Sequence, residues 1–186
     1  GSDVLSDHLL PGLDTAGVPR SLAGTTLAFD HNDTGGFTRL IEEHGDQIGV
    51  VVMEVWRNNR PSADFLDTIR KATASRGIVL IFDEVVTGFR ASSGGAQVLY
   101  GVTPDLTTMA KIVAGALPGG AVGGKAEIVD MIAQRGDPDW DNNHRVYHPG
   151  TFNANPLSSV AGATCLELIA TQPINQRADA MAMRLK

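Results

Sequence analysis

The sequence has one cysteine, no long apolar run and no excess of positive charge. Cys165 has no partner for an internal disulfide, and its place in the helical pattern 157–169 favours a buried small side chain over a nucleophile. The longest apolar runs, such as 48–53, are far too short to span a bilayer. No charged and then apolar leader opens the chain, so no secretory signal is expected. These features favour a cytoplasmic protein that does not associate with a membrane.

Positive charge is scarce because 15 lysine and arginine residues face 21 aspartate and glutamate residues, for a net charge of −6. Without a dense basic run, a nucleic-acid-binding surface is not expected. The five histidines lack the spacing of a zinc site, since His144 and His148 lie in a polar stretch that contains Pro149, so no metal is expected. The glycine-rich stretch 115–124 fits neither a dinucleotide-binding pattern nor a P-loop. A nicotinamide dehydrogenase or a nucleotide hydrolase is therefore disfavoured.

The composition is typical of a globular domain, because 42% of the 186 residues are hydrophobic and 19% are charged. Residues 48–55 form a continuous β-branched run, typical of a strand that is covered on both faces. An amphipathic helix is expected between Ser62 and Gly77, and the apolar run 78–83 predicts a second strand. Strand, helix and strand in this order imply a right-handed crossover and a parallel sheet. The predicted fold class is α/β, with a mainly parallel sheet and helices on both faces.

Shorter patterns predict the remaining elements. We expect helices over 37–45, 126–134, 155–170 and 175–186, and short strands at 25–29, 105–109 and 121–124. The polar stretch 135–148 is expected to form a long exposed loop.

Two adjacent acids come at the end of the second apolar run. In open parallel sheets ligands bind beyond the carboxyl ends of strands, so Asp83 and Glu84 are site candidates, with a capping or turn role as the alternative. Lys111 follows another short predicted strand and precedes the small residues 114–120, which let backbone and ligand approach closely. From residue types alone, Lys111 is equally consistent with a solvated surface lysine.

Three sequence blocks point to a known family. In chain order they are Ile81–Arg90 (IFDEVVTGFR), Thr103–Lys111 (TPDLTTMAK) and Gly150–Leu157 (GTFNANPL). They resemble the class-III aminotransferases, which depend on pyridoxal 5'-phosphate, and within that family the glutamate-1-semialdehyde 2,1-aminomutase-like proteins. The similarity extends through most of residues 25–169. The resemblance implies the large cofactor domain of a fold-type I pyridoxal-phosphate enzyme, present only in part.

The residue patterns and the resemblance together divide the chain into three expected segments. Residues 1–30 are an irregular N-terminal segment, 31–170 a partial pyridoxal-phosphate-binding large domain, and 171–186 the start of a helix leading to a C-terminal small domain that the sequence lacks. The family grips the cofactor phosphate with a loop at a helix N-terminus, upstream of the matched blocks. Neither glycine pair, Gly35-Gly36 or Gly119-Gly120, is followed by the pattern of that loop. The chain alone is therefore expected to hold the cofactor poorly or not at all.

The resemblance assigns roles position by position. Lys111 matches the lysine that holds the cofactor as a Schiff base, and Asp83 matches the acid that pairs with the protonated pyridine nitrogen. Val85 matches the side chain packed against the cofactor ring, and Glu54 matches a glutamate at a strand end near the cofactor. Thr151 matches the threonine that binds the cofactor phosphate, commonly across the interface of a homodimer.

The function that the resemblance implies is amino-group transfer on a small amino- or oxo-substrate, by an aminotransferase or an aminomutase. Both activities share every residue named above, so both stay open. Val55 follows Glu54 where the family often has proline, and Val86 stands where many members carry glutamine. The stretch 57–61, on the substrate side in the family, is shorter and more polar than in the aminomutases, which puts aminomutase specificity in question. A different class of function stays open too: a truncated, non-catalytic fragment that acts as an interaction or structural domain.

Overall fold

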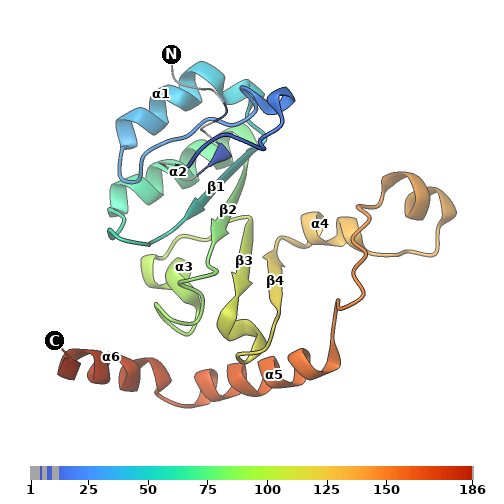
Figure 1. The fold of residues 1–186 in the computed structure, drawn as a ribbon. Coiled ribbons are helices and arrows are strands. Elements are labelled where there is room, and N and C mark those ends of the chain that lie inside the picture. The colour runs from blue at the N-terminus through green and yellow to red at the C-terminus, as the bar shows by residue number, and fades with distance from the viewer. Residues whose placement is uncertain (1–4, 6–7, 10–12, 186) are drawn as a thin grey trace.

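A four-stranded mixed sheet forms the centre of the protein in the computed structural model, which describes residues 5, 8, 9 and 13–185. The strands are β1 (Val50–Glu54), β2 (Val79–Asp83), β3 (Leu106–Ala110) and β4 (Gly120–Gly124), and they lie in this order across the sheet (Figure 1). Strands β1, β2 and β3 run parallel, whereas β4 runs antiparallel to β3. The predicted α/β fold with a mainly parallel sheet is confirmed.

Helices connect and flank the strands. Among the described residues the α-helices are α1 (Thr34–His44), α2 (Ala63–Arg76), α3 (Gly95–Tyr100), α4 (Ala126–Val129), α5 (Pro156–Thr171) and α6 (Ile174–Leu185). The shorter helical turns are η2 (Arg20–Leu22), η3 (Gly45–Gln47), η4 (Lys111–Ala114), η5 (Asp130–Ile132) and the π-helical η6 (Trp140–His144). Ser62 caps α2 as predicted, since its side chain accepts a hydrogen bond from the N–H of Phe65 over 3.1 Å. Gly77 ends α2 at a φ of +68°, which glycine adopts without strain.

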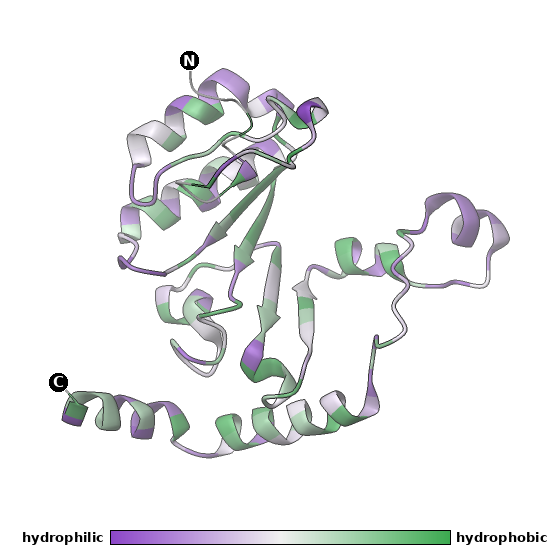
Figure 2. Ribbon diagram, viewed as in Figure 1, coloured by the Kyte–Doolittle hydropathy of each residue, from purple (hydrophilic) through white to green (hydrophobic). Residues whose placement is uncertain are grey.

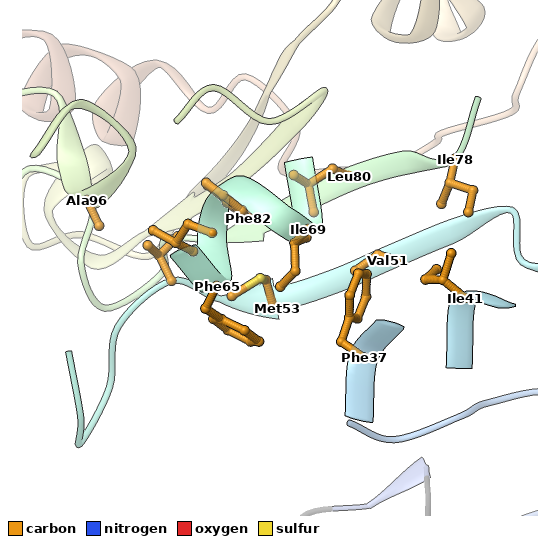
Figure 3. Close-up of a cluster of buried hydrophobic side chains, with 12 residues drawn as sticks. Phe37, Ile41, Val51, Met53, Phe65, Ile69, Ile78, Leu80, Phe82 and Ala96 are labelled. Atoms are coloured by element: carbon orange, nitrogen blue, oxygen red, sulfur yellow. The ribbon is translucent and has the colours of Figure 1, made fainter. Parts of the chain in front are cut away.

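The hydrophobic core lies between one face of the sheet and the helices α1 and α2 (Figure 3). Alternate residues of β1 and β2 pack against apolar residues that recur at helical spacing on α1 and α2. The exposed fraction of each is between 0% and 8%: Phe37, Ile41, Val51, Met53, Phe65, Leu66, Ile69, Leu80 and Phe82. Each large apolar side chain buried in this way contributes about 1.5–3 kcal/mol. This core fixes the two strands whose carboxyl ends carry Glu54 and Asp83.

The opposite face of β1 is open, so the expectation that residues 48–55 are covered on both faces is wrong for the described chain. Val50 and Val52 are 49% and 56% exposed, and Val122 on β4 is 60% exposed. The cause is that α1 and α2 contact each other and therefore lie on the same side of the sheet (Figure 1). Strands β1 and β2 are apolar over most of their length (Figure 2), and with Val50, Val52 and Val122 exposed the uncovered face carries apolar surface.

Two other predicted elements differ from the structure. Residues 25–29 form no strand, and Phe29 instead packs its ring against Phe37 of α1, with the ring centroids 5.2 Å apart. The predicted helix 126–134 is divided into the short helix α4 and the turn η5. Parts of the predicted segment 1–30, and Lys186 at the end of the last predicted helix, lie outside the described residues.

The polar stretch 135–148, expected to be a loop, contains the π-helical turn η6. The guanidinium of Arg135 lies 3.5 Å from the ring centroid of Trp140, and the indole N–H of Trp140 donates to the carbonyl oxygen of Ala133 over 3.0 Å. Cys165, expected to be buried, is half-buried on α5. None of the helices that the structure describes has the length and apolarity that a membrane crossing requires.

Candidate functional site

Asp83 ends β2 at the carboxyl edge of the sheet, where the register places it between Glu54 of β1 and Thr108 of β3. Its Oδ1 atom accepts a hydrogen bond from the N–H of Val85 over 2.9 Å, and its Oδ2 atom accepts none from the described residues. The turn after β2 therefore holds the carboxylate in place and leaves one oxygen available. In parallel sheets of this kind, ligands bind at the edge formed by the carboxyl ends of the strands.

An open cavity of about 640 Å³ lies at this edge. Its wall combines Glu54 and Asp83 with Arg57 and His31. The Nε atom of Arg57 lies 3.6 Å from Oε2 of Glu54, and Nε2 of His31 lies 3.2 Å from the carbonyl oxygen of Val55. The structure thus brings two of the predicted site residues, Glu54 and Asp83, together in one cavity.

Lys111 begins η4 directly after β3 ends. Its φ of +57° is a left-handed conformation that is uncommon for lysine and often found at functional sites. The residue is exposed and takes part in none of the ion pairs among the described residues, whereas Lys71 pairs with Asp67 at 2.6 Å and Lys125 with Asp105 at 2.9 Å. The hydrogen bonds that Lys71 donates to Asp67 and Lys125 donates to Asp105 raise the pKa of both lysines, so both of these amines stay protonated. Lys111 therefore differs from the other two described lysines in having no acidic partner.

Thr151 lies in an exposed turn that precedes α5. Helix α5 packs closely on η4. The approach is so close at Gly162 that an added Cβ atom would collide with the carbonyl oxygen of Val113. Phe152 and Val113 also line a second open cavity, of about 780 Å³, between the turn and η4. Helix α5, which lies along one edge of the molecule in Figure 1, therefore connects the turn of Thr151 to the turn that begins at Lys111.

The structure brings some of the predicted site residues together and leaves others apart. Asp83 and Glu54 share a cavity, and Val85 donates its N–H to Asp83. Lys111 approaches the same edge of the sheet from β3, but neither Lys111 nor Thr151 lines that cavity. Across the described ranges, no group of three or more histidine, cysteine or acidic side chains is placed to hold a metal ion. The single chain thus presents the predicted site residues in two parts, an acidic edge with Glu54 and Asp83, and a second part with Lys111 on η4 and Thr151 in the turn before α5.

Asp105, just before β3, is a buried charged residue that the sequence did not reveal. Its carboxylate accepts hydrogen bonds from Arg70 over 3.1 Å, from Lys125 over 2.9 Å and from the N–H of Leu80 over 2.7 Å. Burial alone would raise the pKa of Asp105, but the donors Leu80, Lys125 and Arg70 together hold that pKa below its usual range. The cluster lies at the amino end of β3, so it stabilises the sheet at the edge opposite the site. Its members are far apart in the sequence, and no motif connects them.

The fold and the placement of Asp83 and Lys111 agree with a family assignment. The family model described as Aminotransferase class-III matches residues 16–186, and the chain belongs to this family. Its members are pyridoxal-phosphate-dependent enzymes, so the resemblance carried by the three sequence blocks is confirmed.

Curated relatives with similar sequences are named as aminomutases. The chain is 46% identical over 163 residues to glutamate-1-semialdehyde 2,1-aminomutase of Methanobrevibacter smithii, covering 86% of this chain and 37% of the relative. It is 39% identical over 177 residues to glutamate-1-semialdehyde 2,1-aminomutase of Methanococcoides burtonii, covering 93% of this chain and 40% of that relative. The chain thus spans about two fifths of the length of these relatives.

Solved structures show the same fold. An omega-transaminase from Sphaerobacter thermophilus is similar with a TM-score of 0.75 and 40% identity, over 82% of this chain and 34% of that protein. A structure described as a transaminase with PLP bound is similar with a TM-score of 0.74 and 29% identity, over 85% of this chain and 36% of that protein. The described sheet and its helices are therefore the fold of a pyridoxal-phosphate transaminase, in part.

Proposed function

We propose that this chain is the cofactor-binding part of a pyridoxal-phosphate-dependent enzyme that moves an amino group, with Lys111 and Asp83 as its central residues. The observation that carries the proposal is that Asp83 ends β2 and Lys111 directly follows the adjacent parallel strand β3, so both lie at the same edge of the sheet. An acid and an amine on neighbouring strand ends suit a cofactor that has a basic ring nitrogen and an aldehyde.

The residues present fit this cofactor. Asp83 offers an oxygen that accepts no hydrogen bond from the described residues, and Lys111 offers an amine without an acidic partner. Pyridoxal phosphate, when bound, supplies an electron sink for the substrate carbon. The Nζ atom of Lys111 would hold the cofactor covalently and, once displaced, move a proton to and from the substrate carbon. The Oδ2 atom of Asp83 would hold the proton on the ring nitrogen, because the opposite charge stabilises it.

Three further residues are proposed to complete the site. Val85 would pack against the cofactor ring, since the turn after β2 holds it next to Asp83. Glu54 would line the substrate side of the cofactor, in the cavity that it shares with Asp83. Thr151 would bind the phosphate of the neighbouring subunit's cofactor in a homodimer. The exposed turn of Thr151, outside the cavity of Asp83, supports a contact in trans.

The proposed substrate is a small amino- or oxo-compound, as in the family. Curated relatives are named as aminomutases and structural neighbours as transaminases, and the two activities use the same residues on this chain. They differ in whether the intermediate is retained or the oxo-product leaves. We propose amino-group transfer as the shared step, in a cytoplasmic setting as predicted from the sequence.

A second candidate function is a non-catalytic interaction or structural domain. The uncovered apolar face at Val52 and Val122 favours it, because exposed apolar surface of this kind promotes association. This alternative predicts no dependence of cofactor binding on Lys111.

The experiment that separates the two candidates is a binding titration. The protein is mixed with pyridoxal 5'-phosphate and the visible absorbance is recorded for the wild type, for Lys111→Ala and for the control Lys71→Ala. Absorbance that is lost only in Lys111→Ala supports the enzyme. Equal absorbance in all three proteins, or none, supports the non-catalytic domain.

A further inference from the structure

Glu84, the residue after Asp83, is a buried carboxylate that is only 1% exposed. It accepts four hydrogen bonds: from the N–H of Ala96 over 2.6 Å, the N–H of Gln97 over 3.0 Å, the side-chain amide of Gln97 over 3.2 Å and the hydroxyl of Thr87 over 2.9 Å. None of the ion pairs among the described residues includes Glu84. Hydrogen bonds therefore satisfy this charge, and burying it without them would be strongly disfavoured.

Glu84 also joins the strands β2 and β3 at two levels. Its N–H donates to the carbonyl oxygen of Thr108 over 2.9 Å, which continues the backbone pairing beyond the end of β2. The side-chain amide of Gln97 donates both to Glu84 and to the hydroxyl of Thr107, the latter over 3.1 Å. The first turn of α3 is thereby held between the end of β2 and Thr107, near the start of β3.

This arrangement has little room to shift. A Cβ atom on Gly95 would lie 2.5 Å and 2.7 Å from the two carboxylate oxygens of Glu84. Side chains alternate along the strand, so Asp83 lines the cavity at the carboxyl edge while Glu84 points toward α3. A movement of Glu84 would move Asp83 with it, and a change in the separation of β2 and β3 would alter the distance from Asp83 to Lys111.

We propose that Glu84 is a positioning residue that sets the distance between Asp83 and Lys111. This inference rests on the proposed function, because it takes these two residues as the pair that holds the cofactor. Glu84 acts through two connections. The backbone joins it to Asp83, and the bridge through Gln97 and Thr107 joins it to the strand that leads to Lys111.

Two variants test this role with matched controls. Glu84→Gln keeps the size of the side chain but sets an amide nitrogen against N–H donors. Gln97→Met removes the side-chain amide that donates to both Glu84 and Thr107. It keeps the backbone N–H of residue 97, which also donates a hydrogen bond to Glu84. The exposed residues Glu42 and Gln47 provide the controls Glu42→Gln and Gln47→Met, which repeat the chemistry away from the site.

Cofactor affinity and the pH midpoint of the Lys111-dependent absorbance are measured with pyridoxal 5'-phosphate, together with the unfolding temperature. We expect Glu84→Gln to weaken cofactor binding by about tenfold and to move the pH midpoint by about one unit. Gln97→Met should move both quantities in the same direction by a smaller amount. A purely structural role would lower the unfolding temperature and leave the pH midpoint unchanged.

The positioning role is overturned if Gln97→Met keeps the wild-type cofactor affinity and the wild-type pH midpoint. The same outcome in Glu84→Gln counts equally, provided that this variant folds. Hydrogen exchange of cofactor-free protein over residues 83–86 and 106–112 separates this failure from failure of the proposed function. If the wild type shows no Lys111-dependent absorbance, the proposed function fails and hydrogen exchange decides the coupling. Faster exchange over both ranges in Gln97→Met, but not in Gln47→Met, supports the coupling, and equal exchange overturns it.

Discussion

Asp83 lies opposite Thr108 in the register of β2 and β3. Thr108 comes three residues before Lys111, the residue that begins η4. Because both strands run in the same direction, their ends bring the acid and the lysine to one edge of the sheet. The N–H of Val85 holds one oxygen of Asp83 and leaves the other to a ligand. This relationship makes Asp83 the most direct place to perturb the proposed chemistry without disturbing the core.

Asp83→Asn should therefore separate activity from stability. The substitution keeps the shape of the side chain and removes the charge that would hold a proton on the cofactor ring. We expect amino-group transfer to fall by about 100-fold or more, with a change in the free energy of unfolding within about 0.5 kcal/mol. Steady-state rates and urea unfolding measure both quantities. Asp46→Asn, on a fully exposed side chain, is the control, and an Asp83→Asn rate equal to the control rate would contradict the role of Asp83.

Thr151 and Lys111 provide a test of the homodimer. If Thr151 serves the neighbour's cofactor, a mixed dimer of Lys111→Ala and Thr151→Ala subunits contains one intact site. We expect each variant alone to bind cofactor poorly and the mixture to recover part of the wild-type absorbance after subunits exchange. A mixture that gives only the average of the two variants would show that Thr151 does not act in trans.

Gly95 begins α3 and Gly101 directly follows it, and the two glycines allow a clash to be separated from backbone strain. Both have positive φ, +76° and +68°, but only Gly95 faces the carboxylate of Glu84, and nothing lies within 4 Å of a Cβ on Gly101. Gly101→Ala should cost about 1 kcal/mol of unfolding free energy from strain alone. Gly95→Ala should cost about 2–4 kcal/mol, because the methyl group also displaces hydrogen-bonded oxygens. Chemical unfolding checks the difference, and equal costs would mean that Glu84 yields easily.

Asp105 should make a pH-dependent contribution to stability. Its folded-state pKa lies below its usual value of 3.8, so its contribution is present above that pH and is lost as the pH falls through the folded-state pKa. Asp105→Asn should destabilise the protein by about 2 kcal/mol at pH 7, because the buried donors lose a charged acceptor. Unfolding measured from pH 7 downward should show this difference shrinking below about pH 4. The exposed pair of Asp67 and Lys71 gives the control Asp67→Asn, which should change the stability far less than Asp105→Asn because solvent screens the pair.

The sequence predicted the positions of the strands well where the hydrophobic runs are long. The run 78–83 ends on an acid, and the structure ends β2 at Asp83. The run 48–55 was misleading about its surroundings, because apolar residues on both faces indicate what a strand can bury and not what covers it in this chain. Val52 is exposed for this reason.

Residue types and strand ends alone could not distinguish the two adjacent acids, and only the resemblance to the family assigned a role to Asp83. Both are acids at the end of the same strand. In the fold, Asp83 lines the cavity and Glu84 accepts hydrogen bonds from the first turn of α3. The same holds for Asp105, whose donors Arg70 and Lys125 come from α2 and from the residue after β4. Contacts between distant segments decide such roles, and a single sequence does not record them.

The central claim is that Lys111, of all the lysines in the chain, is the one that holds the cofactor. The direct measurement is borohydride reduction of the protein mixed with pyridoxal 5'-phosphate, followed by peptide mapping of the modified lysines. We predict that Lys111 carries the reduced cofactor at concentrations where Lys71 and Lys125, each held by an aspartate, are unmodified. Asp83→Asn should reduce the modification of Lys111 without redirecting it. Equal modification of Lys71, Lys111 and Lys125 would contradict the account.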